Sequence, residues 1–151
     1  MKSLPAYFLF SFAALVLCSC SASNKPAANT PKTTAPRSLP GTDWVLSDLA
    51  GIPALPGGKA TLSFTDVGRV AGNASCNRFT GTMLISGNTI QMGPLATTRM
   101  ACADPDVSRQ EDTYLKALGA AARYSYEDPY LLIYAEGYDK PLRFTRAPSS
   151  H

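Results

Sequence analysis

The sequence predicts one antiparallel α+β domain that follows a leader and a linker. Its 151 residues include 45% hydrophobic and 17% charged side chains, a composition that supports one packed core in a chain of this length. After Gly41, short alternating apolar segments are separated by turn residues at the spacing of β-hairpins. One longer segment, residues 106–121, has the apolar periodicity of a helix. Hairpins with a single helix favour an antiparallel sheet over a doubly wound parallel sheet.

The first residues predict a signal peptide. Lys2 is followed by an apolar segment, residues 4–17, that has no polar face. This segment is too short to cross a bilayer core of about 30 Å as a finished helix. It has the length that is typical of the apolar core of a signal peptide.

The end of this segment, Leu17-Cys18-Ser19-Cys20, resembles the lipobox of bacterial lipoproteins. In this interpretation Leu17 stands at −3, Ser19 at −1 and Cys20 at +1. If Cys18 were the acceptor, the bulky Leu17 would stand at −1, so Cys20 is the predicted lipidation site. Cleavage before Cys20 removes residues 1–19, and the two or three acyl chains then hold the protein durably to a membrane. Plain secretion is the alternative.

Residues 20–40 predict a tether that lies outside the folded domain. This segment is rich in Pro, Ala, Ser and Thr and contains almost no large apolar side chain. Lys25, Lys32 and Arg37 could lie against anionic lipid, although the composition favours a solvated spacer. Ser21, rather than Asp, follows the predicted lipidated cysteine. By resemblance to enterobacterial sorting, this favours the outer membrane, with the domain facing the periplasm.

The remaining residues, 41–147, form the predicted domain, and each expected strand is a short apolar or alternating run bounded by turn residues. In residues 61–64, Leu62 and Phe64 fall on one face. Residues 51–58 contain three Gly and two Pro and predict a loop. The expected strands are residues 44–49, 61–64, 69–73, 82–85, 89–92, 124–126, 130–134 and 142–144.

The predicted helix begins at Asp104-Pro105-Asp106, which supplies N-cap chemistry. Glu111 and Asp112 lie early in the helix, where its dipole favours acidic side chains. Capping therefore explains these acidic residues better than a Ca²⁺ site, which needs a glycine-bearing loop of regular spacing. One apolar stripe occupies positions i, i+7, i+8 and i+11, namely Val107, Tyr114, Leu115 and Leu118.

Charge and histidine content exclude several classes of function. Residues 1–37 contain four basic and no acidic side chains, whereas 10 basic and 11 acidic residues occur from Ser38 onward. A folded part near neutrality lacks the basic footprint that nucleic-acid binding needs. The single histidine is His151, the last residue, and the common hydrolase, Walker and dinucleotide motifs are absent from the sequence. We therefore expect no enzymatic activity, no cofactor, no metal site and no nucleic-acid partner.

Cys76 and Cys102 are the two cysteines of the predicted domain. In an oxidising compartment, such a pair is far more often a disulfide than a metal site. Redox chemistry would favour CxxC spacing, and these cysteines lie 26 positions apart. A structural disulfide is the prediction, and free buried thiols and redox chemistry are the alternatives.

Five side chains are candidates for binding a ligand. Arg78 and Arg99 flank the two cysteines and could form an anion subsite, although solvated or paired arginines are the ordinary explanation. Tyr126, Tyr130 and Tyr134 belong to a tyrosine-rich segment and could line a groove. Strand alternation places Tyr130 and Tyr134 on one face. Packing in the core or at its rim is the ordinary explanation of these tyrosines.

Two segments carry a resemblance to a known family. Residues 72–81 read GNASCNRFTG and residues 95–102 read LATTRMAC, so that a CNxFxG motif is followed by TxMAC before the predicted helix. Together with the strand and helix pattern over residues 41–146, these motifs resemble the META domain (HslJ-like) family. The sequence departs from the family pattern at Ser75, where Gly is usual, and at Met83, where an aromatic residue is common.

The resemblance implies a curved antiparallel sheet, a half-barrel packed around a single helix. It also implies an envelope lipoprotein, and some members of the family are linked to heat-shock induction or antibiotic tolerance without an established catalytic activity. We therefore expect a lipid-anchored, non-enzymatic binding or stress factor of the cell envelope, whose partner is an envelope protein or an apolar ligand. The alternatives are a lipid- or peptide-carrying chaperone of secretion-pilot type and an unrecognised cell-wall enzyme.

Overall fold

The computed structural model describes residues 38–148. The predicted signal peptide, the lipidation site Cys20 and most of the predicted tether lie outside these residues. Among the residues that are described, no helix combines the length and the apolar character needed to cross a membrane.

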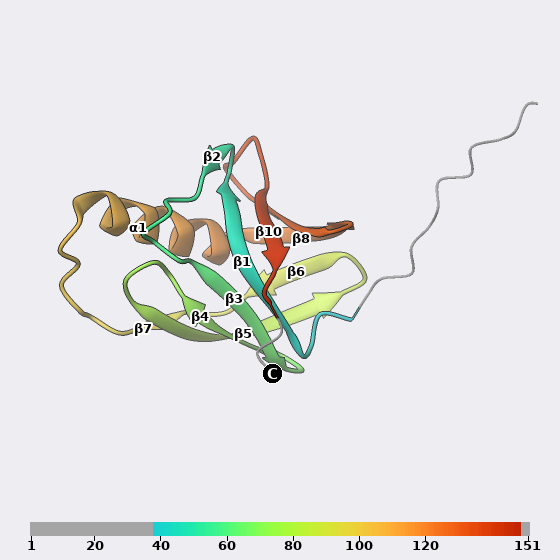
Figure 1. The fold of residues 1–151 in the computed structure, drawn as a ribbon. Helices are drawn as coiled ribbons and strands as arrows, with labels where there is room; N and C mark the ends of the chain where they lie inside the picture. The colour runs from blue at the N-terminus through green and yellow to red at the C-terminus, as the bar shows by residue number, and fades with distance from the viewer. Residues whose placement is uncertain (1–37, 149–151) are drawn as a thin grey trace, which may run out of the picture. The chain divides into compact units, whose positions relative to one another are not determined.

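Ten strands and one helix make up the described domain (Figure 1). The strands are β1 (Thr42–Leu49), β2 (Ile52–Pro53), β3 (Thr61–Asp66), β4 (Arg69–Asn73), β5 (Arg78–Ser86), β6 (Thr89–Met92), β7 (Ala96–Thr97), β8 (Ala121–Glu127), β9 (Tyr130–Ala135) and β10 (Leu142–Arg146), and the helix is α1 (Pro105–Gly119). The segments expected to be strands from their alternation all lie within strands of the structure.

Eight of these strands form a closed antiparallel barrel in the order β1, β3, β4, β5, β6, β8, β9, β10. The barrel closes where β10 pairs with β1, with Val45 opposite Thr145 and Leu46 opposite Phe144. The two-residue strands β2 and β7 pair with β1 and β5 outside this cycle. Every pairing in the sheet is antiparallel, as expected.

The prediction of an α+β half-barrel packed around a helix is therefore wrong. The domain is mostly β, and its sheet closes on itself, with one short helix. A half-barrel would leave two strand edges with unpaired backbone groups, and the β1–β10 pairing satisfies both edges at once.

Alternating side chains fill the interior of the barrel. Leu62 and Phe64 of β3 point inward together, as their alternation predicts, and both are fully buried. On β9, Leu131 and Ile133 are fully buried, while the flanking Tyr130 is exposed. The largest fully buried side chains are Tyr114, Phe64, Phe79, Phe144, Leu39, Leu62, Ile90, Leu118, Leu131, Ile133, Leu142 and Val70.

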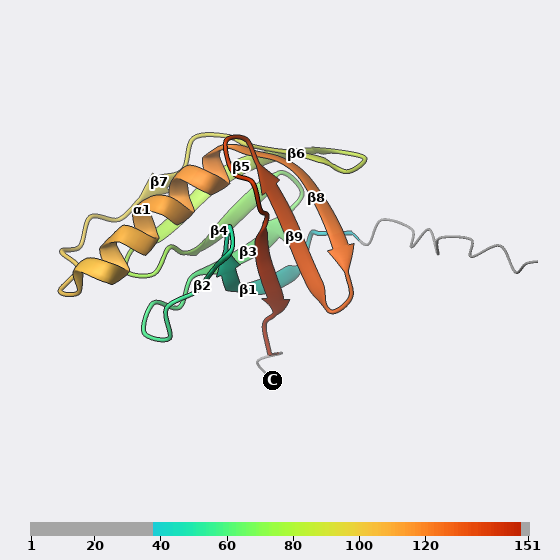
Figure 2. The same ribbon diagram turned by 90° about the horizontal axis from the view of Figure 1, so that it is seen from above.

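Helix α1 covers the end of the barrel at which β3 and β5 begin, and the turn of the β8–β9 hairpin lies far from it (Figure 2). It begins as predicted, because the Asp104 side chain accepts a hydrogen bond of 2.8 Å from the Asp106 amide. Of the predicted apolar stripe, Tyr114 and Leu118 are fully buried, whereas Val107 and Leu115 are half-buried. The buried face also includes two polar residues, Gln110 and Glu111, along with Ala117.

Candidate functional site

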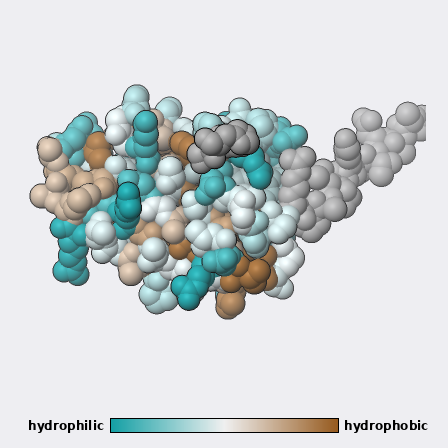
Figure 3. All heavy atoms as spheres, turned by 60° about the horizontal axis from the view of Figure 1, so that its bottom comes forward, coloured by the Kyte–Doolittle hydropathy of each residue, from teal (hydrophilic) through white to brown (hydrophobic). Residues whose placement is uncertain are grey.

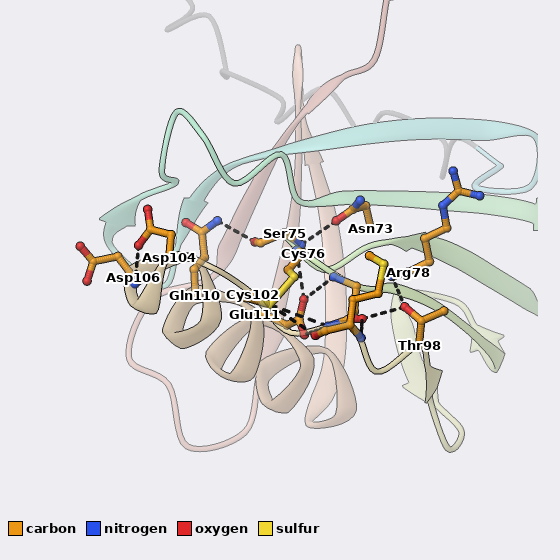
Figure 4. Close-up of a disulfide and its surroundings, with 12 residues drawn as sticks. Asn73, Ser75, Cys76, Arg78, Thr98, Cys102, Asp104, Asp106, Gln110 and Glu111 are labelled. Atoms are coloured by element: carbon orange, nitrogen blue, oxygen red, sulfur yellow. Dashed lines mark hydrogen bonds between the residues drawn. A yellow bond between two sulfur atoms is a disulfide. The ribbon is translucent and has the colours of Figure 1, made fainter.

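The two motif segments meet at the N-terminal half of α1, where a disulfide joins Cys76 to Cys102 (Figure 4). Their Cα atoms lie 6.0 Å apart, so the predicted disulfide is confirmed. Cys76 lies in the turn between β4 and β5, and Cys102 stands two residues before the N-cap Asp104. The disulfide therefore ties the sheet to the start of the helix.

Glu111 of α1 binds the turn that contains Cys76. Its Oε2 atom accepts hydrogen bonds from the backbone amides of Cys76, at 3.0 Å, and Asn77, at 2.6 Å. Its Oε1 atom accepts a hydrogen bond of 2.8 Å from the side-chain amide of Asn77. The Glu111 side chain is buried, and three donors converge on its carboxylate, so residues of the domain itself use both of its oxygen atoms.

Asn77 connects Glu111 to the TxMAC segment. Its Oδ1 atom accepts hydrogen bonds from the Thr98 hydroxyl, at 2.8 Å, and from the Met100 amide, at 2.7 Å. Its Nδ2 atom donates to Glu111 and to the Met100 carbonyl oxygen, the latter at 3.3 Å. Both donors and both acceptor positions of this buried amide are therefore used, which fixes its orientation.

Gln110 fastens the same face of α1 to the loop that follows β2. Its Nε2 atom donates to the Gly58 carbonyl oxygen, at 2.9 Å, and to the Ser75 hydroxyl, at 2.8 Å. Its Oε1 atom accepts a hydrogen bond of 2.7 Å from the Leu55 amide. We call the group formed by the disulfide, Asn77, Thr98, Gln110 and Glu111 the helix clamp.

The departure from the family pattern at Ser75 has a structural cost. Ser75 has a φ of 121°, in the region that favours glycine. The Asn73 side chain accepts a hydrogen bond of 2.8 Å from the Ser75 amide, and the Ser75 hydroxyl accepts one from Gln110. These contacts hold a non-glycine residue in a strained conformation.

Two substitutions separate the strain at Ser75 from its hydrogen bond. Ser75→Ala should lower the free energy of unfolding by about 1 kcal/mol, because the Gln110 amide loses an acceptor. Ser75→Gly loses the same acceptor but relieves the backbone, so this variant should be about 1 kcal/mol more stable than Ser75→Ala. Urea denaturation of the three proteins measures both differences. Equal stability of the two variants would show that the backbone at this position carries no strain.

The ligand atoms of Cys76, Cys102 and Glu111 lie within 4.8 Å of one another, a spacing that a metal ion could use. Metal binding requires cysteine thiolates, and the two sulfur atoms here are bonded to each other. The Glu111 carboxylate already accepts three hydrogen bonds from the domain. In this oxidised state the cluster acts as a structural clamp.

The sequence pattern does not predict the role of several polar residues of the helix clamp. It predicts that Glu111 contributes to helix capping, and it predicts no role for Gln110 or Thr98. Gln110 and Glu111 lie four and three positions before Tyr114, which places them on the buried face of α1. Their position on that face was the available signal, because a polar side chain there needs a buried partner.

The structure does not bring the five candidate binding residues together. Arg78 and Arg99 are exposed near the disulfide, and Tyr126 is half-buried and packs against Trp44 of the core, with ring centroids 5.9 Å apart. Tyr130 and Tyr134 share the outer face of β9, as their spacing predicts.

An arginine from a neighbouring strand covers each of these outer tyrosines. Arg143 of β10 lies 5.3 Å from the ring centroid of Tyr130, and Arg123 of β8 lies 4.6 Å from that of Tyr134. Such contacts are typical of a packed surface layer. A binding role for Tyr130 and Tyr134 stays a prediction.

Tyr114 anchors α1 in the core. Its ring lies 6.0 Å from that of Phe79 and 6.2 Å from that of Phe144, and its hydroxyl donates a hydrogen bond of 3.0 Å to the Thr61 carbonyl oxygen. Burial raises the pKa of this hydroxyl well above its usual value. Tyr114 therefore stays protonated and acts as a hydrogen-bond donor.

The family suggested by these motifs also matches the sequence as a whole. The sequence model of the META domain family matches residues 37–149. The chain belongs to the META domain family. No curated protein matches the sequence.

Three solved structures are similar to this META domain. The NMR structure of a protein from Burkholderia xenovorans has 27% sequence identity and a TM-score of 0.61, over 74% of this chain and 85% of that one. A second NMR structure has 25% identity and a TM-score of 0.57, over 69% and 87% of the two chains. The crystal structure of a DUF4847 family protein from Bacteroides vulgatus has 16% identity and a TM-score of 0.52, over 72% and 94%, and this likeness shows the fold alone.

Proposed function

We propose that this META domain protein is a lipid-anchored, non-enzymatic factor of the cell envelope that binds a partner through its outer surface. The observation that carries the proposal is that the polar residues of the two motifs form hydrogen bonds within the domain. Asn77 and Glu111 are buried and hydrogen-bond to each other and to nearby backbone, and the exposed Thr98 donates its hydroxyl to Asn77. A catalytic site needs polar groups that can reach a substrate.

The filled interior supports the same proposal. Trp44, Phe64, Phe79 and Phe144 are almost completely buried within the barrel. A carrier of a lipid or peptide segment needs an apolar cavity, and close-packed side chains occupy that space in the described domain. The lipobox-like end of the leader supports an anchor at Cys20, and Ser21 supports the periplasmic face of the outer membrane. A role in heat-shock or antibiotic tolerance fits such a factor.

Cys20→Ala tests the anchor. We expect this variant to remain as an uncut precursor that takes up no labelled palmitate, because the thiol that receives the lipid is missing. The measurement is palmitate labelling of the whole chain, together with the size of the product on a gel.

Cys18→Ala is the matched control for this experiment. It removes the neighbouring thiol and leaves the predicted acceptor, so cleavage and labelling should continue. Labelling that persists in Cys20→Ala and stops in Cys18→Ala would overturn the assignment of Cys20. Absence of labelling in the unmodified chain would overturn the lipid anchor itself.

A further inference from the structure

Three apolar side chains are exposed together at the end of the barrel opposite α1. Val67, in the turn between β3 and β4, is 88% exposed, and Leu84, near the end of β5, is 73% exposed. Ile85, beside Leu84, is 38% exposed. We call these three residues the tether-end patch. Figure 3, in which the bottom of Figure 1 comes forward, shows a group of brown apolar side chains on this face.

The tether-end patch borders the point at which the described chain begins. A groove of about 420 Å³ is lined by all three patch residues and also by Ser38, Leu39 and Pro40. Ser38 is the first described residue, so the chain that precedes it is joined to the domain at this groove. The apolar surface and the attachment point of the predicted tether therefore coincide.

The charge of the preceding segment favours a lipid surface as the occupant. Lys25, Lys32 and Arg37 lie between Cys20 and Ser38, and no acidic residue precedes Ser38. Anionic lipid headgroups attract such a segment. A second copy of the chain, seated patch to patch, would instead bring two basic segments together.

The length of the segment allows the domain to reach the membrane. Cys20 stands 18 positions before Ser38, and an extended chain of that length spans at most roughly 60 Å. Within this radius, the tether keeps the patch at a high effective concentration near the bilayer, so a small apolar surface is enough for docking.

We propose that the tether-end patch docks on the lipid bilayer, with Val67 and Leu84 entering the interfacial region beside anionic headgroups. This inference rests on the proposed lipid anchor. Docking fixes the orientation of the domain, so that α1 and the helix clamp face away from the membrane. The surface around α1 is then the part presented to a partner.

The test places an environment-sensitive fluorophore on single introduced cysteines. Val67→Cys and Leu84→Cys report on the patch. Ile52→Cys is the matched control, because Ile52 is 68% exposed and lies in β2, at the end of the barrel covered by α1. The lipidated chains are placed in vesicles of phosphatidylethanolamine and phosphatidylglycerol, with and without a nitroxide quencher on the lipid tails.

We expect a blue shift of emission, and quenching about twofold or more stronger than at position 52, for the labels at positions 67 and 84. Equal quenching at all three positions would overturn docking. A blue shift without quenching that disappears when the protein is diluted in the vesicles would also overturn it, and would show that a second copy covers the patch.

Mass spectrometry of the same samples reports separately whether Cys20 carries lipid. If it does not, the proposed anchor fails, and the measurement is repeated at excess lipid with chains that begin at Ser21. These chains retain every residue that the structure describes, so their quenching at positions 67 and 84 still decides whether the patch binds lipid.

Discussion

Replacing both cysteines of the disulfide, Cys76→Ser with Cys102→Ser, should lower the melting temperature by roughly ten degrees or more without unfolding the domain at 25 °C. The disulfide closes a loop with a sequence separation of 26 residues, and in the chain-entropy model such a loop stabilises by about 3–4 kcal/mol. Folded domains have only about 5–15 kcal/mol of stability in total. The measurement is thermal unfolding of chains that begin at Ser21, monitored by circular dichroism.

The double variant is the appropriate change, because either single variant leaves a reactive thiol. Alkylation of the unmodified protein without reductant is the control, and it should label neither position. A melting temperature unchanged within about two degrees would mean that the hydrogen bonds of the helix clamp hold α1 without the disulfide.

Exchanging the amide and the carboxylate of the helix clamp should show a strong coupling between Asn77 and Glu111. Asn77→Asp alone places two carboxylates at the 2.8 Å contact, and we expect the free energy of unfolding to fall by about 3–4 kcal/mol. Glu111→Gln alone turns one amide toward another, and we expect a loss of about 2 kcal/mol. The first variant places two acceptor oxygens against each other in a buried site, and the second places two N–H donors against each other there.

The double variant Asn77→Asp with Glu111→Gln restores a donor opposite an acceptor. The introduced carboxylate can accept hydrogen bonds from the Met100 amide and the Thr98 hydroxyl. The introduced amide oxygen at position 111 can accept hydrogen bonds from the backbone amides at positions 76 and 77. We therefore expect the double variant to be more stable than Asn77→Asp alone. Urea denaturation of the four proteins gives the coupling energy. Losses that simply add would contradict the contact between these two side chains.

The hairpins and the helix could be predicted because their signals are local. Leu62 and Phe64 alternate along one strand, and Asp104 caps α1 within two residues of itself. Turn residues such as those at 86–88 join strands that are neighbours in sequence, so the register follows from the turn. The disulfide was predictable for a different reason, because the predicted domain contains two cysteines behind a predicted signal peptide, and such a pair in an oxidising compartment is far more often a disulfide than a metal site.

Closure of the barrel could not be predicted, because its signal is not local. The pairing of Val45 with Thr145 joins residues about a hundred positions apart, and neither strand differs in composition from the edge of an open sheet. The strands β2 and β7 have two residues each, too few for a pattern. The buried role of Glu111 could not be predicted, because the helix dipole and buried hydrogen bonds both favour an acidic residue at this position. Only the packing of α1 distinguishes the two explanations.

Because the first strand of the barrel pairs with the last, the barrel cannot close until synthesis of the domain is complete. Until β10 has been made, the outer edges of β1 and β9 have no partner, and the interior lacks Leu142 and Phe144, both fully buried. Most of the stability that comes from closing the barrel is therefore gained only when the final residues of the domain have been made. In a nascent chain of this kind the strand edges of β1 and β9 and part of the core stay exposed until β10 has been made, and the barrel closes last.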